Sequence, residues 1–473
     1  MTLLDPGILP GIDPADLRTA LAVLSAVEDL PEDHPDAVAV RRATARIFKA
    51  VRKQRRAAKR AEVLAADRAV TAATATGAPG RIDDETAGLP LSARAAGPVA
   101  GELRVARACY VCKQRYTLVD AFYHQLCPTC ATQHHAKRDA RTDLTGRRAL
   151  LTGGRAKIGM YIALRLLRDG AETTITTRFP NDAVRRFAAL PDSADWLHRL
   201  RVVGIDLRDP AQVVALADDV ASRGHLDILI NNAAQTVRRP PGSYAALAAA
   251  EQEPAPELVE TITFGHVGSA HPHALEQGAA IPAHAVTALA LTAATPTLEA
   301  AVDAGGLVPD TAAANSWSRV VHEIDPLELL EVQLCNQTAP YLLVSRLRPA
   351  LAAAPARRKY VVNVSAMEGQ FSRKYKGPGH PHTNMAKAAL NMLTRTSAGE
   401  MLATDGILMT AVDTGWITDE RPHPTKARLA EEGFHAPLDL VDGAARVYDP
   451  IVRGEAGEDL CGCFLKDYQP SPW

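Results

Sequence analysis

Short apolar runs alternate with helical patterns over the second part of the chain. Alternation of this kind predicts an α/β fold with a doubly wound parallel sheet that helices cover on both faces. The predicted strands are Arg148–Thr152, Thr173–Thr177, Arg201–Ile205, Leu226–Asn231, Lys359–Ser365, Ile407–Val412 and Cys463–Lys466.

The N-terminal region, residues 1–75, has a helical pattern instead. Asp16–Leu30 places apolar residues on one face, and a longer helix is predicted over Pro35–Thr74. The apolar face of this longer helix has few large side chains and many alanines. Packing against the first helix as a hairpin would therefore stabilise it. The segment Arg41–Arg60 carries ten Lys/Arg and no acid. We interpret this basic run as a solvated helix face, and the alternative is a surface for an acidic or nucleic-acid partner.

Two stretches interrupt the regular pattern. Residues 76–100 are rich in Ala, Gly, Pro and Thr, which predicts a linker. Residues 238–325 are Ala/Pro-rich and weakly patterned, and an insertion of this length is typical of a lid, a substrate site or a partner surface. The expected organisation is therefore a helical region (1–75), a linker (76–100), a cysteine-containing module (101–140) and an α/β domain (143–473).

Composition narrows the function classes. The chain has 473 residues, 47% of them hydrophobic, and a net charge of −1, so as a whole it has no strong electrostatic attraction to nucleic acid or membrane. It contains no apolar run long enough for a transmembrane helix, and its N-terminus lacks the pattern of a signal peptide. A cytoplasmic location is the resulting expectation.

Four of the seven cysteines form two C-x-x-C pairs. Cys109 and Cys112 are followed by Cys127 and Cys130, giving C-x2-C-x14-C-x2-C. Four thiolates at this spacing suit tetrahedral structural Zn²⁺, and the segment resembles zinc-ribbon or treble-clef modules. The competing interpretation is redox chemistry, which two pairs at ribbon spacing disfavour. His124, His134 and His135 are nearby and are alternative ligands.

A glycine-rich run lies between a predicted strand and a predicted helix. Arg148–Thr152 is followed by Gly153-Gly154-Arg155-Ala156-Lys157-Ile158-Gly159, and then by a helical pattern. Glycine lets the backbone approach a pyrophosphate, which is held by the N-terminus of the helix. The arrangement predicts a dinucleotide-binding site.

At this point the chain resembles the short-chain dehydrogenase/reductase family, whose first loop reads T-G-x-x-x-G-x-G. Thr152, Gly153 and Gly159 match, whereas Lys157 replaces the middle glycine. Asn231-Asn232-Ala233-Ala234 looks like the family's N-N-A-G, and Thr414-Gly415-Trp416-Ile417-Thr418 looks like its P-G-x-x-T with the proline lost. The resemblance covers 143–473 and implies a Rossmann-like domain that commonly forms homo-oligomers. It implies the cofactor-binding residues Thr152, Gly153, Arg155, Lys157, Ile158, Gly159, Arg178, Asp206, Leu207, Asn232, Ala233, Lys387 and Gly415.

The end of the second strand of the domain favours NADP(H) over NAD(H). NAD binders place an acid there, and NADP binders often place an arginine near it. This chain has Thr177-Arg178-Phe179 and no acid. Arg178 can pair with a 2′-phosphate, and the alternative is a surface arginine.

The resembled family uses Asn, Ser, Tyr and Lys for catalysis. Asn336 and Lys387 match two of these residues, but Ala366 occupies the serine position and Thr383 the tyrosine position. Ser365 survives one place earlier, on the opposite face of a strand. A threonine hydroxyl is a much weaker acid than a phenol, so another proton donor is expected. The candidates are Tyr375, His380 and His382, with Glu368 after them.

Two functions follow from these patterns. The first is an NADP(H)-dependent oxidoreductase with an altered proton donor, acting on an unknown carbonyl, imine or activated alkene. Retention of Asn336 and Lys387 supports it. The second is a dinucleotide-binding scaffold or sensor without turnover, which the missing Ser and Tyr support.

Overall fold

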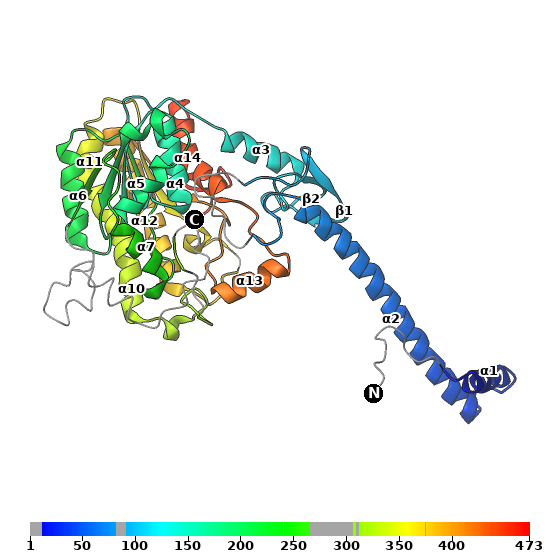
Figure 1. The fold of residues 1–473 in the computed structure, drawn as a ribbon. Helices are drawn as coiled ribbons and strands as arrows, with labels where there is room; N and C mark the ends of the chain where they lie inside the picture. The colour runs from blue at the N-terminus through cyan, green and yellow to red at the C-terminus, as the bar shows by residue number, and fades with distance from the viewer. Residues whose placement is uncertain (1–11, 82–90, 240, 265–305, 309–311, 374) are drawn as a thin grey trace. The chain divides into compact units, whose positions relative to one another are not determined.

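The computed structural model describes residues 12–81, 91–239, 241–264, 306–308, 312–373 and 375–473 (Figure 1). The chain divides into two compact units, Met1–Arg68 and Ala69–Trp473. Each unit is described by itself.

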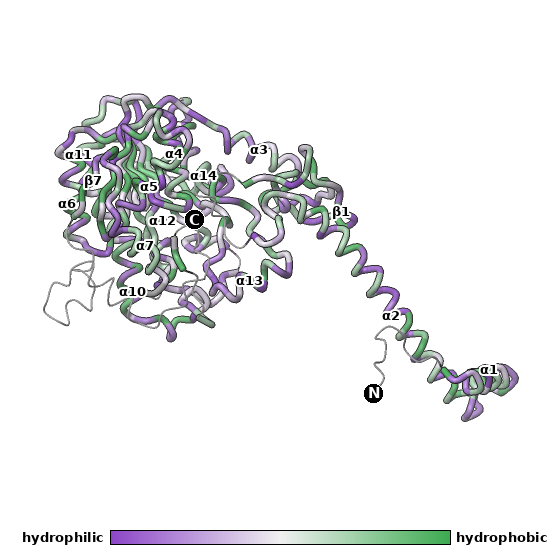
Figure 2. Tube along the Cα trace, in the orientation of Figure 1, coloured by the Kyte–Doolittle hydropathy of each residue, from purple (hydrophilic) through white to green (hydrophobic). Residues whose placement is uncertain are grey.

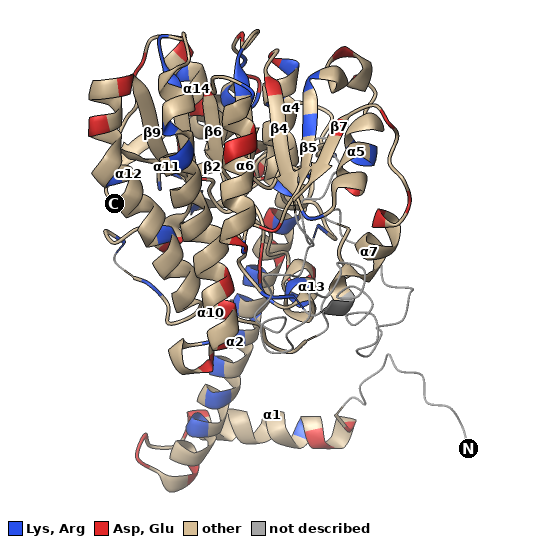
Figure 3. Cartoon of the chain, turned by 90° about the vertical axis from the view of Figure 1, so that its left-hand side faces the viewer, with Lys and Arg blue, Asp and Glu red and all other residues tan. Residues whose placement is uncertain are grey.

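The first unit is helical. Helix α1 (Pro14–Glu28) begins at Asp13, whose side chain accepts a hydrogen bond from the backbone N of Ala15 at 2.7 Å. Helix α2 (Pro35–Ala72) is 38 residues long and carries the dense band of Lys and Arg visible in Figure 3. Both predicted helices are present. The apolar face of α1 is 41–57% exposed at Leu17, Leu21 and Leu24, so the expected packing of the two helices does not cover it.

The second unit is built on a large sheet. Among the described residues its strand order is β11-β10-β9-β8-β6-β3-β4-β5-β7, and all neighbouring pairs are parallel except β10 and β11. All seven predicted strands are present. Their bounds and those of two further strands are β3 (Arg148–Leu151), β4 (Glu172–Thr177), β5 (Leu200–Gly204), β6 (Ile228–Asn231), β7 (Glu260–Thr263), β8 (Lys359–Ser365), β9 (Ile407–Asp413), β10 (Phe464–Lys466) and β11 (Gln469–Ser471).

Helices cover both faces of this sheet, as the predicted fold class requires. One core cluster joins the sheet to α4 (Lys157–Arg168), α5 (Pro180–Ala188) and α14 (Leu440–Glu455). The other joins it to α6 (Pro210–Ser222), α11 (Ala339–Ala352) and α12 (Pro381–Asp405). Every residue of β6, β8 and β9 is buried, because a central parallel strand has helices on both sides (Figure 2).

The cysteine-containing segment is an antiparallel hairpin followed by a helix. It consists of β1 (Val99–Ala108), β2 (Arg115–Asp120) and α3 (Pro128–Arg138). Its buried residues Tyr116, Val119, Tyr123 and Leu126 belong to the same core cluster as α4 and α14. The segment therefore shares a hydrophobic core with the sheet, although its position in the chain had predicted a separate module.

The stretch 238–325 contains more regular structure than its weak pattern predicts. Helix α7 (Ala245–Glu251) packs on α5, and β7 extends the sheet beside β5 in parallel. Within the predicted weakly patterned insertion, residues 241–263 thus contain a helix and a strand of the sheet. Strand β7 has only four residues, too few for a recognisable period. Residues 265–305 and 309–311 lie outside the described residues.

Two further differences concern the segment boundaries. The predicted linker, 76–100, ends in the first residues of β1. Before that, Thr76 donates a hydrogen bond to the carbonyl of Phe122, and Arg81 donates to the carbonyl of Leu438. The described part of the predicted linker thus belongs to the second unit and is hydrogen-bonded to other parts of it. Residues 82–90 lie outside the described residues.

Candidate active site

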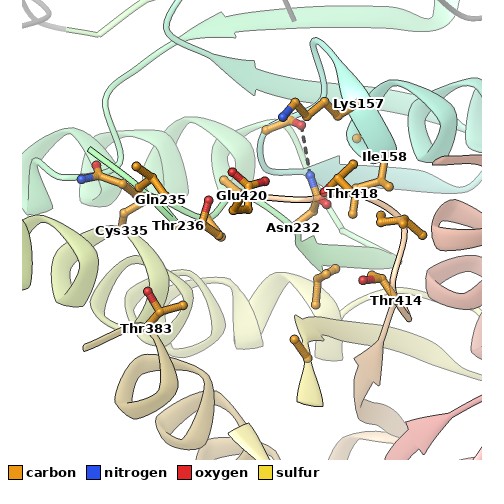
Figure 4. A pocket seen from close by; sticks show the side chains of 18 of the residues that line it. Lys157, Ile158, Asn232, Gln235, Thr236, Cys335, Thr383, Thr414, Thr418 and Glu420 are labelled. Carbon is orange, nitrogen blue, oxygen red and sulfur yellow. Dashed lines mark hydrogen bonds between the residues drawn. The ribbon is translucent and has the colours of Figure 1, made fainter. Parts of the chain in front are cut away.

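A cavity of about 870 Å³ opens at the carboxyl ends of the parallel strands. This edge of an open α/β sheet is where ligands bind. In Figure 4, Lys157, Asn232, Thr383 and Thr414 come from four different segments and face the same space. The predicted site residues that line the cavity are Gly153, Arg155, Lys157, Ile158, Gly159, Arg178, Asp206, Leu207, Asn232, Ala233, Thr383, Lys387 and Gly415.

The loop after β3 keeps its turn although a lysine has replaced glycine. Lys157 has φ 53°, in the left-handed region that glycine favours. The cost of this conformation for an L-residue is about 1–2 kcal/mol. The N-cap of α4 is Ala156, which has no side chain able to cap the helix, and the first turn contains no acid. The first N–H groups of an α-helix have no partner within the helix, and at this turn they fit a pyrophosphate.

Close contacts hold this loop against the end of β6. Asn232 Nδ2 donates to the backbone oxygens of Thr152 and Gly153, both at 3.0 Å. Thr152 Oγ1 accepts from the backbone N of Asn232 and of Ala233. Thr152 is thus a buried support of the loop and is not among the described residues that line the cavity.

We expect Gly159→Ala to weaken dinucleotide binding by about two orders of magnitude. A Cβ at this position would lie 1.9 Å from the carbonyl oxygen of Gly153, and backbone cannot move away as a flexible side chain could. Overpacking of this kind costs about 3 kcal/mol, a loss of affinity on the order of 100-fold. Calorimetric titration measures it. Gly399→Ala, a helical position with open space, is the matched control and should bind normally.

The end of the cavity at β4 is aromatic and basic. Arg178 donates to Tyr244 Oη at 3.4 Å and lies against the rings of Phe179 and Tyr244. Burial alone would raise the pKa of the Tyr244 phenol, but the positive charge of Arg178 lowers it. Arg155 forms an ion pair with Asp182 at 2.5 Å.

Asp206 is engaged by a neighbour. Arg208 donates to both of its carboxylate oxygens, at 3.0 and 2.5 Å. Burial opposes ionisation of Asp206, but these hydrogen bonds lower its pKa. In this structure the carboxylate of Asp206, one of the expected cofactor-binding residues, is thus paired with an arginine.

The other end of the cavity, at β8 and β9, holds Lys387. Its side chain is buried and its Nζ donates to the carbonyl of Val364 at 2.8 Å. Burial lowers the pKa of Lys387 to about 8. Thr383 lies one helical turn earlier on α12, on the same face, and its buried Oγ1 has no hydrogen-bond partner among the described residues. This end of the cavity therefore combines a lysine whose pKa is close to neutral pH with a hydroxyl that has no hydrogen-bond partner among the described residues.

The other expected catalytic positions have different surroundings. Asn336 is fully buried in a π-helical turn, η5 (Leu334–Thr338). Its Oδ1 accepts from the backbone N of Gln235 at 2.7 Å, and its Nδ2 donates to the carbonyl of Gln235 at 2.9 Å. The Ser365 hydroxyl donates to Asn391 Oδ1 at 2.6 Å, and both Ser365 and Ala366 line the cavity.

Three of the predicted proton donors lie apart from the cavity. Tyr375 is 73% exposed. His380 stacks on Trp317 with ring centroids 3.9 Å apart, and its Nδ1 bonds the Trp317 carbonyl. His382 is buried, and burial lowers its pKa. None of the three is among the described residues that line the cavity, whereas Thr383 and Glu368 are.

The cavity also contains residues that sequence analysis missed. Tyr244, Trp317, Arg239 and Glu420 all line it, the first three from the stretch 238–325. The most distant in sequence is Tyr110, which lies between the cysteines of the first pair. No local pattern points to these residues, because folding brings them to the site from segments that are far away in the chain.

The four predicted metal ligands lie together. The sulfur atoms of Cys109, Cys112, Cys127 and Cys130 are all within 4.8 Å of one another, and three of the four cysteines are buried. Four thiolates at this separation fit one tetrahedral Zn²⁺. The neighbouring histidines have other partners: His124 Nδ1 bonds Thr76 Oγ1 at 2.8 Å, and His134 Nδ1 bonds the carbonyl of Cys130.

Comparison with known proteins gives the following matches. Residues 147–266 match the family model for short chain dehydrogenase. An uncharacterized protein of Acanthamoeba polyphaga mimivirus is 31% identical over 359 residues, which are 73% of this chain and 71% of the viral protein. A protein named "Probable oxidoreductase" from Streptomyces antibioticus is 44% identical over 94 residues, 19% of this chain and 30% of its own length.

Among solved structures, one match is a short chain dehydrogenase from Burkholderia cenocepacia in complex with NADP. It is 20% identical, with a TM-score of 0.44, and the match covers 68% of this chain and 97% of that protein. Within the described residues, no helix is both long enough and apolar enough to cross a membrane.

Proposed function

The chain belongs to the short-chain dehydrogenase/reductase family, and on this premise we propose that it is an NADP(H)-dependent oxidoreductase. The proposal rests on one observation: the same cavity contains both Arg178, at the end of β4, and Lys387, beside β8. Its substrate would be a carbonyl, imine or activated alkene.

Each part of the cavity has a role in this proposal. The N-terminus of α4, with Lys157 and Arg155 near it, would hold the pyrophosphate. Arg178 would pair with the 2′-phosphate, and the rings of Phe179 and Tyr244 would pack beside it. Bound NADP(H) would supply or accept a hydride at the end of the cavity that contains Lys387.

The proton would come from Lys387. A pKa of about 8 keeps Nζ protonated at neutral pH and still able to give up its proton. The Thr383 hydroxyl, on the same helix face, can accept a hydrogen bond from a protonated group and donate one to a substrate. We assign to Thr383 the orientation of the reacting group and to Lys387 Nζ the supply of the proton.

We expect NADPH to bind more tightly than NADH, and Arg178→Gln to remove the preference. Loss of a charge-assisted contact to a phosphate costs about 1.5–3 kcal/mol, a factor of roughly 10 to 100 in Kd for NADPH. The Kd for NADH should change little, because NADH lacks the 2′-phosphate. Calorimetric titration of both nucleotides against both proteins measures the effect. Equal affinities in the unaltered protein would contradict the role of Arg178.

The second candidate function is a dinucleotide-binding scaffold without turnover. The position of Thr383, where the family has a tyrosine, favours it. One experiment distinguishes the oxidoreductase from the scaffold. Tight NADPH binding with no oxidation of NADPH across a panel of carbonyls, imines and enoyl compounds would select the scaffold.

We also propose structural Zn²⁺ at the cysteine cluster. All four positions of a tetrahedral ion would be filled by protein, so the ion would contribute stability and no chemistry.

A further inference from the structure

We propose that metal binding at the cysteine cluster sets the affinity of the cavity for the nicotinamide half of the cofactor, and that Tyr110 is the positioning residue that connects them. The proposal rests on the dinucleotide site proposed above. It gives the metal a function in cofactor binding as well as in stability.

Tyr110 belongs to the metal-binding turn by sequence and to the cavity by position. It directly follows Cys109, and its backbone N donates to the carbonyl of Gln125 at 2.8 Å. Its ring packs against the common core and lines the cavity. Its Oη accepts a hydrogen bond from the backbone N of Trp416 at 3.0 Å.

The partner of Tyr110 is the loop that follows β9. Gly415, Trp416, Ile417 and Thr418 of this loop all line the cavity. The loop has no regular secondary structure, so few backbone hydrogen bonds fix it. The bond from Trp416 to Tyr110 therefore holds its backbone against the metal-binding turn.

The place of this loop in the sheet decides which half of the cofactor it affects. Strand β9 lies beside β8, whose residue Val364 bonds Lys387. Strand β4, which carries Arg178 at its end, is separated from β9 by β8, β6 and β3. Tyr110 thus acts at the Lys387 end, where hydride transfer would occur, and not at the 2′-phosphate end.

The turn depends on the metal for its conformation. Lys113, next to Cys112, has φ 64°, a left-handed conformation that a lysine rarely adopts. Without a cation, sulfur atoms within 4.8 Å of one another would lose the interaction that holds them together. Cys112 is exposed, so this side of the turn has little packing to replace it.

The rest of the segment is anchored independently of Tyr110. Arg138 forms a buried ion pair with Asp439 at 2.5 Å, and Tyr123 Oη donates to Asp442 at 2.6 Å. His134 Nε2 lies 2.8 Å from Arg446 Nη2. A substitution that removes only the Tyr110 hydroxyl should therefore leave the segment docked on α14.

The test compares Tyr110→Phe with Tyr116→Phe in the zinc-replete protein. Tyr116 is a buried tyrosine of the same segment whose Oη donates to the carbonyl of His124 at 3.0 Å, outside the cavity. Both variants should retain one Zn²⁺ per chain by elemental analysis. Loss of one hydrogen bond of about 1 kcal/mol predicts a Kd for NADPH raised roughly fivefold in Tyr110→Phe and unchanged in Tyr116→Phe.

A fragment without nicotinamide locates the effect. The Kd for 2′,5′-ADP should be the same in all three proteins. Removal of zinc by a chelator from unaltered protein that remains folded by circular dichroism should raise the Kd for NADPH about as much as Tyr110→Phe does, and should add little in that variant. A zinc-retaining Tyr110→Phe protein with unchanged NADPH affinity would overturn the proposal.

Two other results have separate meanings. If the unaltered protein binds neither NADPH nor 2′,5′-ADP, the dinucleotide site itself is wrong. If Tyr110→Phe does not fold, a second measurement on the unaltered protein tests the proposal. It is acrylamide quenching of the fluorescence of Trp416, whose signal is obtained by comparison with Trp416→Phe. Quenching should increase when zinc is removed, and constant quenching would overturn the proposal.

Discussion

Cys127→Ser is expected to destabilise the whole second unit. Cys127 is 7% exposed, lies at the N-cap of α3 and is one of the four clustered cysteines that we propose as zinc ligands. Its core cluster continues without a break into α4 and α14. Loss of a structural metal is among the few single changes that cost more than about 4 kcal/mol, and we expect a loss of that order. Thermal unfolding followed by circular dichroism measures it.

The control for this substitution is Cys463→Ser. Cys463 is half-buried beside β10, outside the metal cluster, so it tests the loss of a sulfur atom without the loss of a ligand. Its unfolding temperature should change by only a few degrees. A zinc-free Cys127→Ser protein that unfolds at the same temperature as the unaltered chain would show that the cluster does not stabilise the fold.

Sequence patterns were sufficient to predict the central strands of the sheet, because the residue types in these strands follow directly from their burial. Strands such as β8 and β9 are buried on both faces, so most of the residues in them are apolar. The glycine run after β3 was also predictable, because its position between a strand and a helix defines its conformation. In both cases local sequence and final structure are linked over a few residues.

Edge elements and long-range contacts were not predictable in this way. Strand β7 owes its place to pairing with β5, and its exposed residues Glu260 and Thr261 carry no apolar period. Tyr110 enters the cavity only because the hairpin β1–β2 packs on the same core as the sheet. These positions depend on the tertiary fold, which a single sequence does not reveal.

In the candidate site, too, residues with a local sequence signal were predictable, and contacts that depend on the tertiary fold were not. Lys387 was predicted from its match to the catalytic lysine of the resembled family, and it lines the cavity. His380 was one of the candidate donors because histidine is a common general acid and this one lies shortly before Thr383 in the sequence. Its stacking on Trp317 could not be foreseen, because Trp317 lies in the weakly patterned stretch.

Lys387→Ala should lower kcat on an identified substrate by about 100-fold or more, the scale of a general acid. In the unaltered protein, reduction should decline tenfold per pH unit above about pH 8, because burial places the pKa of Lys387 near that value and only its protonated form is an acid. Lys387→Arg should lose this decline, since a guanidinium stays protonated throughout the range. Initial rates between pH 6 and 10 measure all three proteins. Lys376→Arg, an exposed neighbouring lysine, should keep the pH profile of the unaltered protein.

The stability of Lys387→Met gives a readout that does not depend on turnover. Since the pKa of Lys387 is lowered from 10.5 to about 8, the folded protein binds fewer protons than the unfolded chain between these values. The cost of the buried charge is thus fully present below about pH 8 and disappears as the pH rises through 10.5. Lys387→Met should unfold at higher denaturant concentration than the unaltered protein at pH 7, and the difference should shrink by pH 10. An unstable variant at pH 7 would show that the lysine is not held against a burial penalty, and its role as a near-neutral acid would lose its physical basis.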